Sequence, residues 1–466
     1  MRPEMKEYNF DWMLWSLTTI ASNTMNGTEK ELTHLLPYAP YFRGILEVFI
    51  SHGKAGSTLL DIMKKYMENI ITAHSRGKKI AISTFCFSPA IFYAMDVVPI
   101  TLELLTVMAT TMFKRGTSDY LDYCCEVGFT ETSCSSQRGS LGAYLAGLGE
   151  EIDFVVCDSA GICDTNANAF AFASSYLDKP LFQLNYPPTL VDARTKAYHR
   201  EDYKGLISFI EAQTGKKLDP DRLRMVLEEI RKQDELIAEL EEMQRLVPNP
   251  LPGIYNFFIH AGRFLFAGLP DYTVQLKEML RVGEKNAKDG LSGLHSGSEK
   301  VRALFCYIDH YSLHMKLWDW LDIHGVSHMG NILSRFYAGT APYLEERTEE
   351  GYDIDTSTVD SMIDSIAEIN ANMPMVRTIR GPYDAPHLWL DDVLFLSKMY
   401  KTDCIIYNGT PGCRNTWGMV KLLARDTEKH GLPTLILYAD AFDERVQSWD
   451  ATAERLGEFF RVRGLI

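Results

Sequence analysis

Three cysteines are placed where they could act together on one ligand. Cys134 stands at the head of an amphipathic, helix-like run, and Cys163 follows the short apolar run IDFVVCDS. Cys413 comes much later, between a strand-like run and a helix-like run. Thiols that precede helices or follow strands can project from one end of an open α/β sheet, where such folds bind ligands. Because thiolates are the usual ligands of iron–sulfur clusters, this placement predicts a cluster held between two domains.

The other cysteines divide into one further candidate and several that fit a core. The chain has nine cysteines, and an odd number argues against a disulfide framework. Cys86 follows a strand-like run and precedes a predicted helix start, so it is a fourth candidate metal ligand, a redox-active thiol or a buried one. Cys157 and Cys404 lie inside apolar strand-like runs, and we expect both to be core residues.

Size and composition fit a large acidic globular protein. The chain has 466 residues, enough for two or three domains, since single cores rarely exceed about 250–300 residues. The net charge of −15 argues against binding to nucleic acid or anionic membranes. The start of the chain lacks the features of a secretory signal. Prolines and carboxylates interrupt the apolar residues 80–113, which predicts a buried strand followed by a helix rather than a membrane span. We therefore expect a cytoplasmic protein.

The order of the elements predicts an α/β protein with two open parallel-sheet α/β domains around a cleft for the cluster. We assign residues 1–78 to an N-terminal helical segment, 79–195 to the first α/β domain, 196–300 to a helical connecting region and 301–466 to the second α/β domain. The run DKPLFQL of the first domain and the run HGLPTLIL of the second share one pattern, in which a helix, a turn with proline and an apolar strand follow one another. The two domains are therefore expected to be related lobes.

Helices and strands alternate in both predicted domains. In the first, we expect helices at 139–149 and 165–178 and strands at 152–158 and 180–185. In the second, we expect a helix at 312–323, a long helical region through 373, helices at 387–401, 415–429 and 450–461, and strands at 403–408 and 434–440. The run KVRALFCYID fits a strand or a buried helix, and the setting of Cys306 favours a helix. Between the domains, NPLPGIYNFFIHAG is expected to interrupt the helical region.

Several familiar catalytic motifs are missing from the sequence. His310/His314 and His324/His328 are spaced four residues apart, but neither pair carries the glutamate of a HExxH metalloprotease motif. We expect these histidines to be core or surface residues. There is no GxxxxGK[ST] loop and no GxGxxG motif after a strand, so we do not expect the chain to hydrolyse nucleotides. A GxSxG elbow is also missing.

Two blocks of sequence resemble the 2-hydroxyacyl-CoA dehydratase and benzoyl-CoA reductase family. The first runs from Cys134-SSQRGSLGAYLAG through IDFVV to GI-Cys163-D. The second contains Gly412-Cys413-Arg414, GLPTLIL, Asp440 and Asp443-Glu444-Arg445. FCFSPAIFYAMDVVPI is similar to the Cys-x-x-(Thr/Ser)-Pro motif of the family, with Cys86 as its thiol. The similarity covers roughly residues 79–190 and 385–466.

The resemblance implies a 2-hydroxyglutaryl-CoA dehydratase-like iron–sulfur subunit. In this family two α/β domains grip a [4Fe-4S] cluster beside a CoA thioester, and a separate ATP-hydrolysing iron–sulfur activator injects one electron. The dehydratases form a ketyl radical anion that lets the hydroxyl leave, whereas the reductases place electrons in an aromatic ring. The family enzymes usually pair two related chains. The resemblance implies Cys134, Cys163 and Cys413 as cluster ligands, and we expect Cys86 one shell of residues behind them.

Two functions of different classes remain open at this point. One is catalysis on a CoA thioester, either 2-hydroxyacyl-CoA dehydration or aromatic acyl-CoA reduction. The alternative is an electron-transfer subunit, or a double-cubane-type iron–sulfur reductase of small molecules that does not use CoA esters. The sequence assigns no catalytic residue beyond the candidate ligands.

Overall fold

The structure is a computed structural model that describes residues 9–25, 52–113, 115–158, 163–185, 193–309, 316–332, 353–373, 388–413 and 417–466. His310 and His314 lie outside the described residues, so the prediction for this pair is not addressed by the structure. Within the described residues, none of the helices is both long enough and apolar enough to cross a membrane.

Each of the two α/β domains is built on a four-stranded parallel sheet. The first sheet contains β1 (Ile80–Ser83), β2 (Val98–Thr101), β3 (Phe154–Asp158) and β4 (Leu181–Leu184), in the order β2-β1-β3-β4. The second contains β5 (Val301–Tyr307), β6 (Val326–Asn331), β7 (Cys404–Gly409) and β8 (Thr434–Tyr438), in the order β6-β5-β7-β8. This architecture confirms the predicted α/β class with two parallel sheets.

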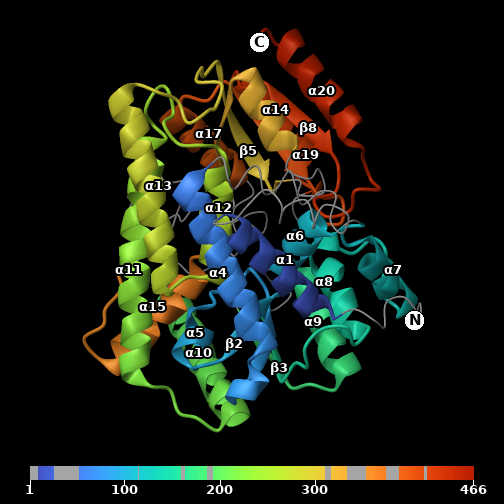
Figure 1. The fold of residues 1–466 in the computed structure, drawn as a ribbon, viewed down its shortest axis with the longest axis vertical. Helices are drawn as coiled ribbons and strands as arrows, with labels where there is room; N and C mark the ends of the chain where they lie inside the picture. The colour runs from blue at the N-terminus through green and yellow to red at the C-terminus, as the bar shows by residue number, and fades with distance from the viewer. Residues whose placement is uncertain are drawn as a thin grey trace.

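The two sheets share one topology, with the first strand of each in the interior and the last at an edge. The runs DKPLFQL and HGLPTLIL supply the equivalent edge strands β4 and β8. All residues of β1, β3, β5 and β7 are buried, as expected for parallel strands covered by helices on both faces. Figure 1 shows the first domain below the second, with the helices α1, α4 and α12 between the labelled strands of the two sheets.

Helices before and within the first domain enclose its sheet. They are α1 (Phe10–Met25), α4 (Gly53–Ile71), α5 (Ala90–Ala94), α6 (Leu102–Met112), α7 (Ser118–Glu126), α8 (Ser135–Leu145), α9 (Asp164–Leu177) and α10 (Ala193–Thr214). Glycines let α8 approach its neighbours closely. A Cβ atom at Gly142 would lie 2.1 Å from the backbone oxygen of Tyr120 in α7, so a larger residue would push the two helices apart.

The helix α10 begins at the end of the first domain and runs into the connecting region, which also contains α11 (Pro220–Met243), α12 (Ile254–Leu265) and α13 (Pro270–Asp289). The long helices α11 and α13 pack side by side along one edge of the molecule (Figure 1). The prediction that NPLPGIYNFFIHAG interrupts the helical region was wrong for most of that run, because α12 is helical and all of its residues are buried. Its two prolines precede the helix and therefore cost it no internal hydrogen bond.

The second domain adds α14 (Lys316–His324), α15 (Val359–Ala371), α17 (Leu388–Tyr400), α19 (Val420–Lys429) and α20 (Trp449–Val462). Two predictions were wrong here. Cys306 lies in strand β5 and not on a helix, and β6 interrupts the predicted long helical region. Gly325 explains the second error, since its φ of +75° ends α14 in a conformation that glycine adopts readily. Cys157 and Cys404 are fully buried strand residues, as predicted.

Candidate functional site

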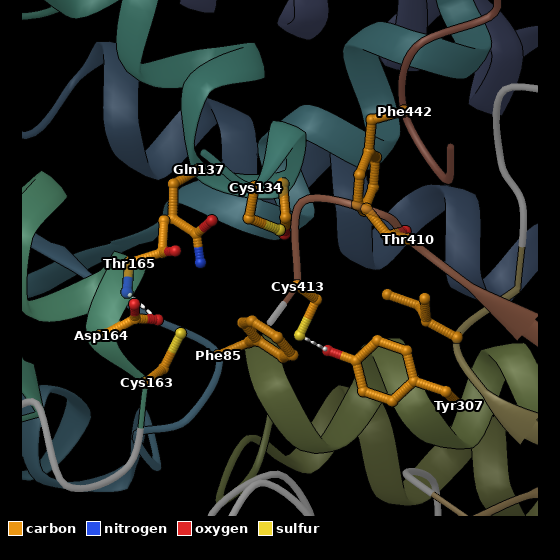
Figure 2. A pocket seen from close by; sticks show the side chains of 12 residues that line it. Phe85, Cys134, Gln137, Cys163, Asp164, Thr165, Tyr307, Thr410, Cys413 and Phe442 are labelled. Carbon is orange, nitrogen blue, oxygen red and sulfur yellow. Dashed lines mark hydrogen bonds between the residues drawn. The ribbon is translucent and has the colours of Figure 1, made fainter. Parts of the chain in front are cut away.

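The carboxyl ends of the two sheets meet at one cavity, shown in Figure 2. The space not filled by atoms, its open mouth included, is about 450 Å³. The lining residues follow strands β1, β3, β5, β7 and β8 or begin helices α8 and α9; they are Phe85, Cys134, Ser136, Gln137, Cys163, Asp164, Thr165, Tyr307, Ile308, Thr410, Cys413 and Phe442. The three cysteines singled out in the sequence therefore line a single cavity, to which both domains contribute. This is the place where open α/β sheets bind their ligands.

Cys134 and Cys163 occupy equivalent positions, because each is the residue immediately before a helix. Cys134 is the N-cap of α8 and Cys163 the N-cap of α9. Neither cysteine side chain makes a capping hydrogen bond to its helix. The backbone N–H of Ser136 nevertheless lowers the pKa of the Cys134 thiol, and that of Asn166 lowers the pKa of the Cys163 thiol. Unpaired N–H groups and the helix dipole favour negative charge at this end of a helix. Both positions therefore favour a thiolate.

Cys413 reaches the same cavity from the turn after β7. A Cβ atom at the preceding Gly412 would lie 2.9 Å from the Cα atom of Cys134, so only glycine allows the two cysteine loops to approach this closely. The hydroxyl of Tyr307, which ends β5, lies 3.4 Å from the sulfur of Cys413 (Figure 2). The guanidinium of Arg138, in α8, donates to the backbone oxygens of Ser133 and Glu131 and so fixes the loop before Cys134.

Burial is the main influence on the cavity thiols. It raises the pKa of Cys134 and of Cys163 well above the usual value, and the neighbouring Cys413 raises both further. The pKa of the Tyr307 hydroxyl is also well above its usual range, because of burial and then because of the nearby thiols. Three buried thiolates would repel one another unless positive charge lay between them. Iron ions bound by the sulfurs would supply that charge.

The donor set fits a polynuclear cluster better than a single ion. In the described part of the chain, no group of three or more His, Cys, Asp or Glu side chains is placed to hold one metal ion. The thiols instead stand around a shared cavity (Figure 2). In a [4Fe-4S] cluster each thiolate binds a different iron atom, so the sulfurs are spaced apart around the cluster. Buried thiols at the N-termini of two helices and in the turn after β7 meet these requirements, and the residues present fit the group.

A buried polar network lies directly behind the cavity. Gln137 donates from Nε2 to Glu103 Oε1 over 3.4 Å and to Asn166 Oδ1. Asn166 in turn donates to Asp158 Oδ1 over 3.1 Å. Burial raises the pKa of Glu103 to about 8 and that of Asp158 to about 7. Two carboxyl groups that hold protons near neutral pH therefore stand behind the cavity lining.

A comparison with known protein families shows which family the chain belongs to. The model of the 2-hydroxyglutaryl-CoA dehydratase D-component family matches residues 84–462, which include every residue lining the cavity. The chain belongs to this family. The family resemblance expected from the two sequence blocks is thereby confirmed, and the chain is a dehydratase-type component. Comparison with curated proteins finds no matching sequence.

The loop after β8 ties the two domains of this dehydratase component together beside the cavity. Ser135 Oγ, next to Cys134, donates to Asp440 Oδ1 over 2.5 Å. Thr117 Oγ1 donates to the backbone oxygen of Phe442 over 3.0 Å. Arg445 bonds Asp443 in its own loop and Asp122 in α7. These contacts hold the loop after β8 against helices of the first domain and so close one side of the cavity.

Cys86 lies behind the site and does not line the cavity. Its thiol is fully buried and accepts a hydrogen bond of 3.4 Å from Asn166 Nδ2. Burial raises its pKa well above the usual value, and Asp158 and then Cys163 raise it further. The structure thus brings together Cys134, Cys163 and Cys413 and places Cys86 in the polar network at the back.

Sequence reasoning assigned no role to the polar residues of this site, although some signals were present. Glu103 interrupts the apolar run VPITLELL, and Asp158 ends the apolar strand IDFVVCD. A carboxylate within such a run is a signal of a buried, paired acid. Tyr307 carries no such signal.

His328 is buried between the rings of Phe305 and Trp318 and lies 3.2 Å from Asp309, so it is a core residue rather than half of a metal-binding pair.

Proposed function

We propose that the chain is the iron–sulfur subunit of a low-potential radical 2-hydroxyacyl-CoA dehydratase. One observation carries this proposal: three cysteines, contributed by both domains, line one buried cavity within the matched family region. Cys134, Cys163 and Cys413 hold a [4Fe-4S] cluster in this proposal, and the CoA thioester lies beside it. A related second chain completes the enzyme, and an ATP-hydrolysing iron–sulfur activator delivers the electron. The dehydratase name of the matched family favours dehydration over aromatic reduction.

A bound cluster would supply one electron together with an iron atom that can act as a Lewis acid. The residues of this chain would set the environment for that chemistry. Helices α8 and α9 begin at the cavity, so their N-terminal dipoles stabilise negative charge that develops there. Phe85, Ile308 and Phe442 supply apolar surface that limits the access of water to the reacting groups.

The polar network would hold protons close to the reacting atoms. Glu103 accepts from Thr84 Oγ1 and Phe85 N and is joined to the cavity through Gln137. Its pKa of about 8, raised by burial, keeps its carboxyl group protonated at neutral pH. Loss of a hydroxyl group as water requires one proton on the leaving oxygen. Because Glu103 does not line the cavity, a water molecule would have to carry its proton to the leaving oxygen.

Turnover assays with and without an activator test the proposed function. The sequence contains no phosphate-binding loop, so the purified chain with its partner subunit is expected to show neither ATPase activity nor dehydration on its own. An ATP-hydrolysing iron–sulfur activator together with MgATP is expected to start the dehydration of a 2-hydroxyacyl-CoA. Turnover of an acyl-CoA with a mild reductant and no nucleotide would contradict the proposal.

A further inference from the structure

Two polar atoms at the start of α8 line the cavity without a partner. They are Ser136 Oγ and Gln137 Oε1, which have no hydrogen-bond partner in the described part of the chain. Their residues are 3% and 2% exposed, so bulk water does not satisfy these atoms. Figure 2 shows the Gln137 side chain directed into the cavity, between Cys134 and Cys163. A buried polar atom without a partner destabilises the folded protein, so the pair marks a place where a ligand can bind.

The hydrogen bonds that Gln137 already makes determine which hydrogen bond its amide oxygen can form with a ligand. Both protons of its amide nitrogen have acceptors, Glu103 Oε1 and Asn166 Oδ1. This arrangement leaves the amide oxygen facing the cavity, where it can only accept a hydrogen bond. Ser136 differs because its hydroxyl can donate or accept. The ligand must therefore present a donor to Gln137 and can present an acceptor to Ser136.

From this pattern we propose that Gln137 accepts a hydrogen bond from the 2-hydroxyl group of a 2-hydroxyacyl-CoA and that Ser136 donates one to its thioester carbonyl. The inference rests on the proposed use of a CoA thioester and adds the residues that select the acyl group. A 2-hydroxyacyl group carries a donor and an acceptor on adjacent carbon atoms, and Ser136 and Gln137 both line the one cavity that would hold it. A benzoyl group has no donor for Gln137, and a saturated acyl group also lacks one.

A buried amide oxygen can discriminate between ligands, because it is left without a hydrogen bond when the ligand has no donor for it. When a hydroxylated acyl group binds, the oxygen gains a partner. When an acyl group without a hydroxyl binds, the oxygen stays unpaired, and that ligand binds more weakly. Gln137 is thus a specificity-determining residue, and its bond to Glu103 places the 2-hydroxyl group one side chain away from a carboxyl group that holds a proton.

Binding measurements with two matched thioesters test this inference. Lactoyl-CoA carries the 2-hydroxyl group and propionyl-CoA lacks it, while the carbonyl and CoA parts are the same. Isothermal titration of the full chain, purified anaerobically with its partner subunit, is expected to show about 2- to 10-fold tighter binding of lactoyl-CoA, the range of one net hydrogen bond. The variant Gln137→Met is expected to abolish this preference.

The serine variant gives a second, independent readout. Ser136→Ala is expected to weaken both thioesters by a similar factor, because both have the carbonyl group. It should not lower the melting temperature, since Ser136 Oγ has no partner within the described residues whose hydrogen bond would be lost. Ser397→Ala is the matched control, because Ser397 Oγ is also buried without a partner but lies in α17, outside the cavity lining.

Equal affinity of the wild type for the two thioesters would overturn the inference and leave the proposed function standing. So would a preference that survives in Gln137→Met, because another group would then recognise the 2-hydroxyl group. If neither thioester binds to the wild type, the proposed function and this inference are both wrong.

Discussion

Tyr307 has an unusual backbone conformation, and its hydroxyl contacts Cys413, a candidate cluster ligand. It ends β5 with a φ of +96°, a value that residues other than glycine rarely adopt, and its hydroxyl lies 3.4 Å from the Cys413 sulfur. Such conformations persist where the surrounding structure enforces them, and they cluster at functional sites. Here the conformation places the ring in the cavity wall (Figure 2). We interpret the hydroxyl as a donor to the sulfur when the thiol is deprotonated.

Replacing Tyr307 with Phe is predicted to lower the reduction potential of the bound cluster. Hydrogen bonds to cluster sulfurs are among the factors that set this potential, and a donor stabilises the more negative reduced state. An anaerobic redox titration followed by EPR measures the change. Tyr203→Phe is the control, because its buried hydroxyl has no partner in the described residues and does not line the cavity. An unchanged or higher potential in Tyr307→Phe would contradict the role of the hydroxyl.

The thiols could be located from the sequence, but their polar neighbours could not. Cys134, Cys163 and Cys413 each lie beside a strand or helix boundary that local patterns reveal. Gln137 and Asn166 meet only because α8 and α9 pack together, 29 positions apart in the sequence. Glu103 and Asp158 looked like isolated acids in apolar runs. Pairing between such residues depends on tertiary packing, which periodicity does not encode.

At the scale of elements, the turn that carries Cys413 packs on the start of α8 through Gly412. A Cβ atom at this position would lie 2.9 Å from Cys134 Cα and 3.0 Å from Ser133 O, and neither backbone atom can move without its loop. Gly412→Ala is therefore predicted to separate the two loops, to lower the iron content and to reduce stability by roughly 1–3 kcal/mol. Iron analysis and urea denaturation measure both effects.

Gly457→Ala is the matched control for that substitution. Gly457 lies within α20, and a Cβ atom there would have no neighbour within 4 Å. The exchange is expected to keep the iron content and to raise stability slightly, because alanine favours a helix. If Gly412→Ala keeps the iron content of the wild type as well, the close approach of the two loops does not matter for the site.

Helix α1 is fixed to the first domain through a buried carboxyl group. Asp11 accepts from Tyr144 Oη over 2.8 Å and from Glu150 N over 2.7 Å. Burial raises its pKa from 3.8 to about 6, and the charge of Glu150 also raises it, while these two hydrogen bonds act in the opposite direction. The folded protein therefore keeps a proton on Asp11 between about pH 4 and pH 6, where the unfolded chain has lost it.

This difference predicts how stability changes with pH. Because the folded state binds more protons in that window, the Asp11 contribution makes the free energy of unfolding fall as pH rises, by at most about 1.4 kcal/mol per pH unit. The variant Asp11→Asn cannot titrate and should lack this part of the slope. Urea denaturation between pH 4 and pH 6 compares the two proteins. Equal slopes would show that Asp11 is ionised in the folded state.

Most strands and helices were predictable, and the exceptions have physical causes. Helices such as α1, α11 and α20 follow clear apolar periodicity, and β7 and β8 are short apolar runs between turn residues. The strand β6, VSHMGN, alternates weakly and carries a histidine, so nothing local separates it from the helices around it. The helix α12 does have an amphipathic pattern, but Pro250, Pro252 and Gly253 stand directly before it and suggested a break rather than the start of a helix.

At the scale of the whole molecule, two lobes with the same sheet topology face each other, and the carboxyl ends of their strands meet at the cavity. We propose that the domain boundaries lie where the sequence suggests, with lobes at 79–195 and 301–466, helical residues 1–78 before them and 196–300 between them. Ser135–Asp440 and Arg445–Asp122 join the lobes at the cavity, so the site exists only when both are docked. A cluster ligated from both lobes would stabilise that docking.

Iron and acid-labile sulfide analysis of the anaerobically purified chain tests the central claim most directly. The account predicts about four of each per chain in the wild type. It predicts loss of the cluster in Cys134→Ser, Cys163→Ser and Cys413→Ser with the fold retained, and no loss in Cys404→Ala, whose thiol is buried in β7 away from the cavity. A wild-type chain without iron and sulfide, or a full cluster in all three serine variants, would contradict it.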